Sequence, residues 1–128
     1  MITKERGQSL VEMAIIMPFV LVIIAGVIDF GHILRTYTIV VNAAREAAFA
    51  GAAAQLSDND IRALVNDELE RGGVQGGTAT TAITYQSKGS PAAQTIIVNL
   101  TYEVPLLMLS LAAPSITVRT NAETVTFW

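Results

Sequence analysis

One carboxylate stands out among the residues of this chain that could do chemistry. Glu12 is the only ionisable side chain in residues 10–28, an apolar run of about 20 residues, which is the length that crosses a bilayer. A charge inside such a segment costs at least about 2.5 kcal/mol, so it normally marks a partner or a function. The run and its carboxylate are therefore the features around which the rest of the sequence is interpreted.

Catalytic chemistry has little support elsewhere in the chain. There is no cysteine and a single histidine, His32, so disulfides, thiolate catalysis and a Cys/His pair are excluded. We interpret His32 as a polar residue at the membrane interface, because no Ser-His-acid motif accompanies it. The glycines of residues 72–77 lack the Lys-Ser/Thr of a phosphate-binding loop. We predict that the chain is not an enzyme and uses no cofactor and no small-molecule substrate.

The acidic segment 58–60 resembles part of a calcium loop, but the glycine and the distal glutamate of an EF-hand are missing. Helix capping is the preferred interpretation. Ser57 is placed as an N-cap with Asp60 at the capping-box position, and Leu56 and Ile61 are placed as a hydrophobic staple. The net charge of −3 gives no basic surface. We therefore predict no metal site and no nucleic-acid partner.

The element that must position Glu12 is a membrane helix. At 52% hydrophobic and 15% charged residues, the chain is too apolar for a typical small soluble domain. Lys4 and Arg6 precede the run, and this predicts that the N-terminus lies on the cytoplasmic side of the membrane. The chain from about Asp29 onward would then be exported. A cleaved secretory signal is the competing interpretation. The length of the run and the lack of a clean small-x-small site argue against it.

Helical periodicity continues past the apolar run to about residue 54. Two rows of small residues follow a four-residue spacing there: Ala43, Ala47 and Gly51 in one, and Ala44, Ala48 and Ala52 in the other. Such rows allow another backbone to approach closely. Alternatively, they lie under the protein's own sheet, with alanine present simply as a good helix former. The sequence leaves both interpretations open.

The remaining sequence predicts a small α+β domain. A short helix begins at Ser57, carries an apolar stripe and ends at Gly72-Gly73. The period then changes to two, which predicts strands at residues 78–86, 95–104 and 115–127, with a hairpin connection at residues 88–91. The third strand loses its parity, and a bulge near residues 121–124 would return its apolar side chains to one face. We expect an antiparallel sheet of three to four strands.

The connection at residues 105–114 is almost wholly apolar, which is unexpected on a solvated surface. It could dock on the flank of the long helix, on the membrane or on a partner. Docking within the chain is the first expectation, because so small a domain has little other core.

The first residues of the chain resemble a known family. Gly7, four residues, and Glu12 at the head of an apolar helix resemble the type IV prepilin processing site. Together with Pro18 inside the helix, where a kink is expected, and the segment 42–48, they resemble the TadE-like proteins of tight-adherence pili. The resemblance covers residues 7–52 well. It implies a pilin-like minor component with a leader at residues 1–7, a helix at residues 8–54 and an exported α+β domain at residues 55–128.

The resemblance also implies partners and roles for particular residues. Prepilin peptidase would cut between Gly7 and Gln8, and Glu12 would then meet the terminal amine of a neighbouring pilin-like subunit, a pairing that makes a carboxylate tolerable in apolar surroundings. The alternative for Glu12 is a carboxylate that reaches back to the cytoplasmic interface. Gln8 stands where many pilins have an aromatic residue, which leaves N-methylation open.

The expected function is therefore that of a minor pilin contributing to assembly or initiation of a tight-adherence pilus and to surface adhesion. Two alternatives remain: a permanently tethered accessory protein, and a pseudopilin of a secretion system.

Overall fold

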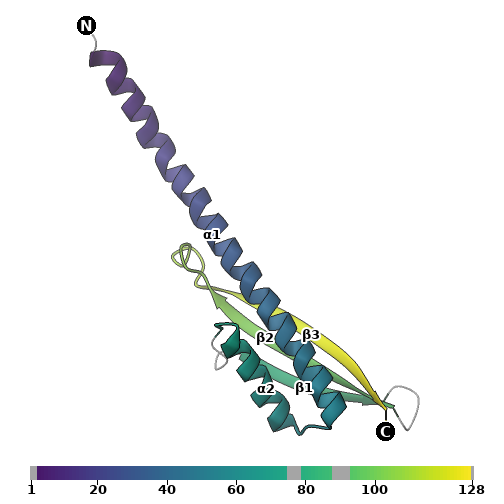
Figure 1. Ribbon diagram of the computed structural model, residues 1–128. Coiled ribbons are helices and arrows are strands. Elements are labelled where there is room, and N and C mark those ends of the chain that lie inside the picture. Colours follow the sequence, from purple (N-terminus) through teal and green to yellow (C-terminus); the bar gives the residue numbers. More distant parts are fainter. Residues whose placement is uncertain (1–2, 75–78, 88–92, 128) are drawn as a thin grey trace.

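The computed structural model describes residues 3–74, 79–87 and 93–127. Two helices and three strands follow one another along the chain, and Figure 1 shows a long helix whose second half lies across the sheet. Their bounds are α1 Thr3–Ala54, α2 Asp58–Arg71, β1 Ala79–Ser87, β2 Ala93–Pro105 and β3 Ser115–Phe127. The α+β prediction is confirmed, with three strands in the sheet.

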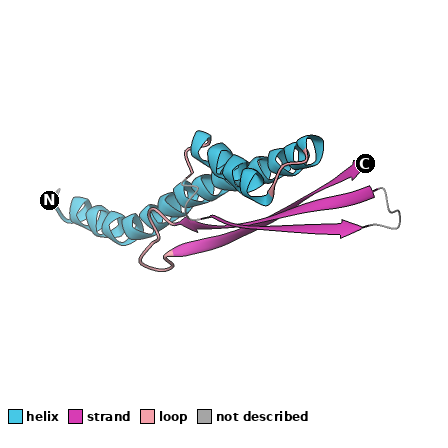
Figure 2. Cartoon of the chain, turned by 90° about the horizontal axis from the view of Figure 1, so that it is seen from below, coloured by secondary structure: helices cyan, strands magenta, loops and turns pink. Residues whose placement is uncertain are grey.

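The strands form an antiparallel meander in the order β1-β2-β3. The alternation predicted for β2 is confirmed, because five alternate side chains point inward and are buried: Ile96, Val98, Leu100, Tyr102 and Val104. In register with Val98 lie Ile83 of β1 and Ala122 of β3. Figure 2 shows both helices on one side of the sheet, so the opposite face is uncovered. The predicted connection at residues 88–91 lies outside the described residues.

The predicted bulge in β3 is wrong. Every residue of β3 has one partner in β2, from Ser115 opposite Pro105 to Phe127 opposite Ala93, so no extra residue is inserted near residues 121–124. Val125 therefore stays on the outer face, where its side chain is 44% exposed, while Val118 and Ala122 are buried on the inner face. The uninterrupted ladder keeps all its hydrogen bonds, and Val125 near the strand's end leaves the core at little cost.

The capping signals of α2 position it against the sheet. Ser57 Oγ accepts a hydrogen bond from the Asp60 N–H at 3.3 Å and donates to Asp60 Oδ2 at 2.7 Å, which confirms the predicted N-cap. The helix ends where Gly73 adopts a φ of +77° and the Val74 N–H donates to the Leu69 carbonyl at 2.8 Å. The capped helix buries Ile61 and two further apolar side chains, Val65 and Leu69.

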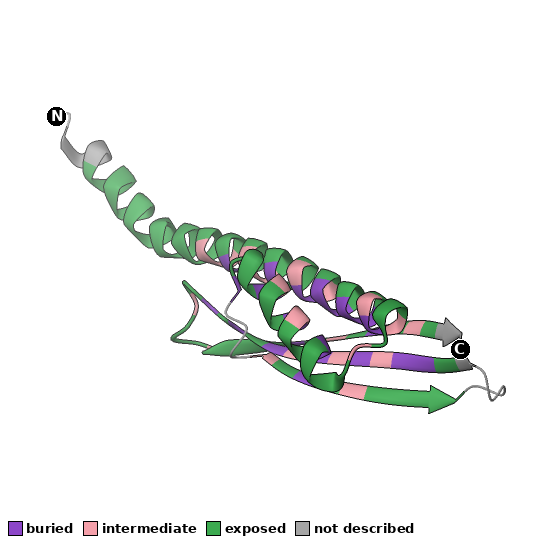
Figure 3. Cartoon of the chain, turned by 60° about the horizontal axis from the view of Figure 1, so that its bottom comes forward, coloured by how far each residue is buried: buried purple, intermediate pink, exposed green. Residues whose placement is uncertain are grey.

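The core lies between the second half of α1, α2 and the inner face of the sheet (Figure 3). The small rows of α1 are part of it: Ala43, Ala44, Ala47 and Ala48 are all 1% exposed or less. A Cβ added at Gly51 would lie 2.8 Å from Ile61 Cδ1 of α2, which is closer than real contacts allow. The small residues therefore let the chain's own sheet and second helix approach α1 closely.

Candidate functional site

Residues 7–24, in the first half of α1, are all exposed in the part of the chain that the structure describes. The large apolar side chains of this half are exposed, from Leu10 at 71% to Val27 at 67%, and the most apolar stretch of the helix has no residue buried. The helix from Gly7 to Ala54 is long and apolar enough to cross a membrane. Water is a poor solvent for such a surface, and lipid is a good one. This half of α1 therefore fits a single-pass membrane protein.

The structure places Gly7, Gln8 and Glu12 within the first turns of this exposed helix. The Gln8 side-chain amide donates a hydrogen bond to Glu12 Oε1 at 3.3 Å, one helical turn away. A Cβ added at Gly7 would meet nothing within 4 Å, so the backbone around this glycine is accessible to another protein. The helix continues through Pro18, whose missing N–H leaves the Ala14 carbonyl without its usual partner.

The other predicted packing residues lie far from this end. Ala43, Ala47 and Gly51 are buried in the domain core, more than 30 positions along α1 from Glu12. The structure therefore does not bring them together with the N-terminal residues. The two groups have different surroundings, because one surface is exposed and the other is covered by the chain's own elements.

Asp29, at the junction of the two halves of α1, was not predicted to have a role. Its side chain is 2% exposed and accepts four hydrogen bonds from three successive backbone N–H groups of the β2–β3 connection. Leu107 donates to Oδ1 at 2.8 Å, Met108 to Oδ1 at 3.0 Å and to Oδ2 at 3.2 Å, and Leu109 to Oδ2 at 2.7 Å. Successive N–H groups arranged in this way form a concave anion site, which a carboxylate fills.

We call the hydrogen bonds from residues 107–109 to Asp29 the clamp. The clamp confirms that the apolar connection docks on the flank of α1. Leu106 is 9% exposed, and its N–H donates to the Pro114 carbonyl, which closes the base of the connection. The signal in the sequence was an aspartate immediately after the apolar run. It could not be assigned, because the three donors are backbone groups, which carry no residue-type signature.

Other polar groups serve the fold. The Tyr85 hydroxyl donates to Asp58 Oδ1 at 2.5 Å, and Asp60 pairs with Ser57, so both aspartates of the acidic segment have partners in the chain. Among the described residues, no group of three or more His, Cys, Asp or Glu side chains is close enough to hold a metal ion. Within the domain, these carboxylates are accounted for by capping and by contacts between elements.

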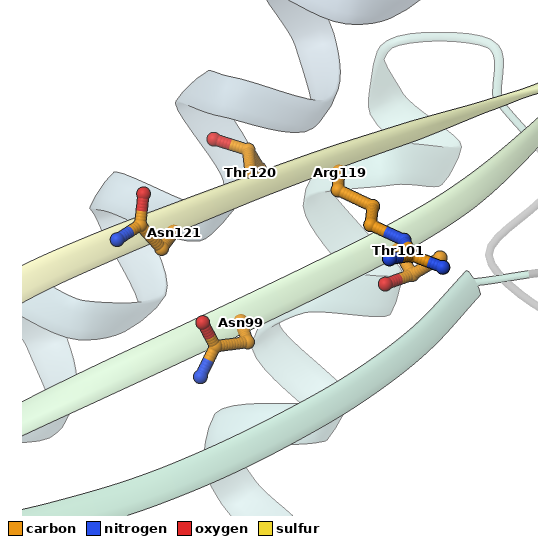
Figure 4. A pocket seen from close by; sticks show the side chains of 5 residues that line it. All are labelled: Asn99, Thr101, Arg119, Thr120 and Asn121. Carbon is orange, nitrogen blue, oxygen red and sulfur yellow. The ribbon is translucent and has the colours of Figure 1, made fainter.

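The hollows in the described part of the molecule include two that are lined by polar residues. One, of about 430 Å³, lies between α1, the end of α2 and β2, and is lined by His32 and Thr36 among others. The second, of about 260 Å³, lies on the uncovered face of the sheet, where the Arg119 side chain extends over Thr101 and Asn99 stands beside Asn121 (Figure 4). His32, Glu103 and Ser115 all line the larger hollow, but among the described residues no hydrogen bond joins these three side chains, as it would in a nucleophile–base–acid set.

Comparison with known proteins places the N-terminal features in a family context. The profile of the TadE-like protein family matches residues 7–48. The match begins at Gly7, includes Glu12 and Pro18, and ends in the part of α1 that packs on the sheet. It confirms, over these residues, the resemblance to TadE-like proteins that the sequence predicts. No curated protein and no solved structure matched the chain.

Proposed function

We propose that this chain, whose residues 7–48 match the TadE-like family, is a minor pilin of a tight-adherence pilus that contributes to pilus assembly or initiation and to surface adhesion. The observation that carries the proposal is the family match at the head of an exposed apolar helix that continues into a separately packed domain. The helix has a bare half, residues 7–28, which is largely exposed, and a packed half, residues 29–54, which contacts the rest of the domain. Such a helix suits a subunit that is first held in a bilayer and then packs with other pilin-like subunits.

Processing is the first step of the proposal. Prepilin peptidase cuts between Gly7 and Gln8, removes the leader at residues 1–7 and leaves Gln8 as the new N-terminus. The open surroundings of Gly7 support access by a membrane peptidase. The chain then spans the cytoplasmic membrane once, with its N-terminus inside and the domain of residues 55–128 exported, carried by the helix of residues 8–54.

Glu12 is the docking group of the proposal. Its carboxylate is exposed on the bare half of α1 and accepts one hydrogen bond from Gln8 of the same chain. One amide hydrogen bond does not compensate a carboxylate in lipid, so an ammonium group on a neighbouring subunit would stabilise it further. A kink at Pro18, which the sequence predicts, would adjust the angle at which this half of α1 meets such a neighbour.

The processing step is tested with Gly7→Ala in cells that contain an active prepilin peptidase. The variant retains the fold, because a Cβ at this position meets nothing within 4 Å. We expect wild-type chain recovered from membranes to begin at Gln8 and the variant to begin at Met1, as read by intact mass and N-terminal sequencing. Gly26→Ala is the matched control, since Gly26 is equally open in the same helix and should be processed normally. Wild-type protein that keeps Met1 contradicts the proposal.

The docking role separates the proposal from the alternatives. We expect Glu12→Ala to be processed but to be lost from sheared pilus fractions, while Glu46→Ala, an exposed acid on the packed half of α1, is incorporated normally. A permanently tethered accessory protein would never enter the sheared fraction, and a secretion pseudopilin would stay in a periplasmic structure. Normal incorporation of Glu12→Ala contradicts the docking role and leaves the processing step standing.

A further inference from the structure

The tip of the β2–β3 connection exposes more apolar surface than the domain requires. Leu107 and Met108 are each 56% exposed, and Leu111 is fully exposed. The sequence between Glu103 and Arg119 contains no charged residue. Three large aliphatic side chains gathered on one uncharged turn form the kind of patch that marks contact with a partner or a lipid surface.

The backbone of this tip is arranged for a medium that offers few hydrogen bonds. Six of the eight N–H groups of residues 106–113 donate within the chain: three to Asp29, one to Pro114, and two, from Ala112 and Ala113, to the Leu109 carbonyl. The Asp29 carboxylate is in turn enclosed by its donors. A segment that enters an apolar region must satisfy its polar backbone groups internally, and this one largely does.

The position of the tip along α1 identifies that medium. Residues 10–28 rise about 28 Å as a helix, close to the roughly 30 Å of a bilayer's hydrocarbon core, and Asp29 follows immediately. If residues 10–28 span the hydrocarbon, the hydrogen bonds to Asp29 hold the tip at its outer boundary. Figures 1 and 2 both show the connection on the end of the sheet that lies nearest the bare half of α1. Phe30 and Leu34 of α1, 66% and 55% exposed, extend the apolar surface at the same level.

We propose that Leu107, Met108 and Leu111 insert into the outer interfacial region of the bilayer that α1 crosses, so that the exported domain has a second membrane contact beside its helix. This inference rests on the proposed function, because it requires α1 to span the membrane. The clamp at Asp29 is a positioning device: it fixes the turn against the helix and presents the side chains toward lipid. With two contacts instead of one, the domain is restricted in how far it can tilt relative to the membrane surface.

The test places single cysteines in the full chain, which has none of its own. Leu111→Cys reports the tip, Ile23→Cys reports the span, and Phe49→Cys is the matched control, an exposed apolar residue 20 positions beyond Asp29 on the same helix. Each variant carries a polarity-sensitive fluorophore and is reconstituted in nanodiscs of phosphatidylcholine and phosphatidylglycerol, in one preparation with a single copy per disc and in another with several. Lipids with a nitroxide close to the headgroup then quench the probes that reach the interface.

We expect the Leu111 probe to show blue-shifted emission and quenching comparable to that of Ile23 and several-fold stronger than that of Phe49. A Leu111 probe that behaves like Phe49, while Ile23 is quenched, overturns the inference and leaves the membrane span intact. Shielding of Leu111 only in discs that hold several copies also overturns it, in favour of contact with a second copy of this chain. Absence of quenching at Ile23 refutes the span itself, and the proposed function with it.

The clamp is tested by Asp29→Asn in the Leu111→Cys background. The amide keeps the size of the side chain but replaces one acceptor oxygen by a donor, so it cannot receive all of the three N–H groups. We expect faster amide hydrogen exchange at residues 107–109 and weaker lipid quenching of the Leu111 probe, with exchange in β2 residues 96–100 unchanged. Glu46→Gln, the same change at an exposed site of α1, should alter neither. Unchanged quenching in Asp29→Asn contradicts the positioning role.

Discussion

The two halves of α1 belong to one uninterrupted helix and have opposite surroundings. Between Leu10 and Ile28 the helix presents large apolar side chains that are exposed. Between Val40 and Ala48 the side chains that face the core are one valine and four alanines, and all five are buried. Lipid-facing surface tolerates bulky aliphatic residues of any shape, because lipid tails conform to them. A sheet packed on a helix does not, because interiors are close-packed. The change in side-chain size along α1 therefore coincides with the point where the domain core begins to cover the helix.

Ala47→Leu should have the largest effect of the changes that test this comparison. Ala47 is completely buried, so three added carbon atoms must displace the sheet, and we expect the free energy of unfolding to fall by about 3 kcal/mol. The same change at Ala14, which is exposed on the bare half, should leave it within about 0.5 kcal/mol. Urea titrations of the full chain in nonionic detergent, followed by near-ultraviolet circular dichroism, measure both. Equal losses at the two positions would break the comparison.

Val40→Ala tests the same division by removing volume instead of adding it. Val40 is 0% exposed, and the loss of two methyl groups together with the cavity left behind should cost about 2 kcal/mol. Val22→Ala is the matched change on the bare half. The Val22 side chain is 60% exposed, so its truncation should not change the free energy of unfolding of the domain. The urea midpoint should move only for Val40→Ala. A shift of similar size for Val22→Ala would show that the bare half packs on the domain.

Patterns along single elements were predictable from the sequence. The two-residue period of β2, the Ser57 cap and the Gly72-Gly73 stop are local signals, and each is present in the structure. The bulge was predicted from parity alone and is wrong, because pairing along the whole of β3 outweighs the burial of Val125. The sequence also could not show which element packs against the two rows of small residues in α1, because a row of alanines fits any close neighbour.

The Asp29 clamp shows the limit of such prediction most clearly. It joins residues 78 to 80 positions apart, and its donors are backbone groups of a turn whose conformation no side-chain pattern encodes. Asp29 itself was visible as the first charge after the apolar run. The sequence did not indicate that the apolar β2–β3 connection contacts α1 at Asp29.

The smallest expected effect concerns a contact confined to the packed side of the molecule. A hydrogen bond from Tyr85 to the Asp58 carboxylate, together with desolvation and the negative charge of Asp58, raises the pKa of the Tyr85 phenol above its usual value of about 10. Because the folded state holds this proton more tightly than the unfolded chain, the contribution is fully present below about pH 10 and is lost as pH rises through the raised pKa.

Tyr85→Phe should therefore lower the stability of the domain slightly at pH 7, by about 0.5 kcal/mol after allowance for the exposure of the tyrosine, and should remove part of the loss that wild type shows in alkaline solution. Urea midpoints at pH 7 and above pH 10 measure the difference. Tyr37→Phe is the control, because Tyr37 has the same 46% exposure but lies on α1 outside the contact between α2 and β1. If wild type and Tyr85→Phe lose stability in parallel above pH 10, the phenol does not link α2 to the sheet. Attachment of α2 to the sheet would then depend on its apolar stripe and on the hydrogen bond that Arg62 donates to the Thr81 carbonyl of β1.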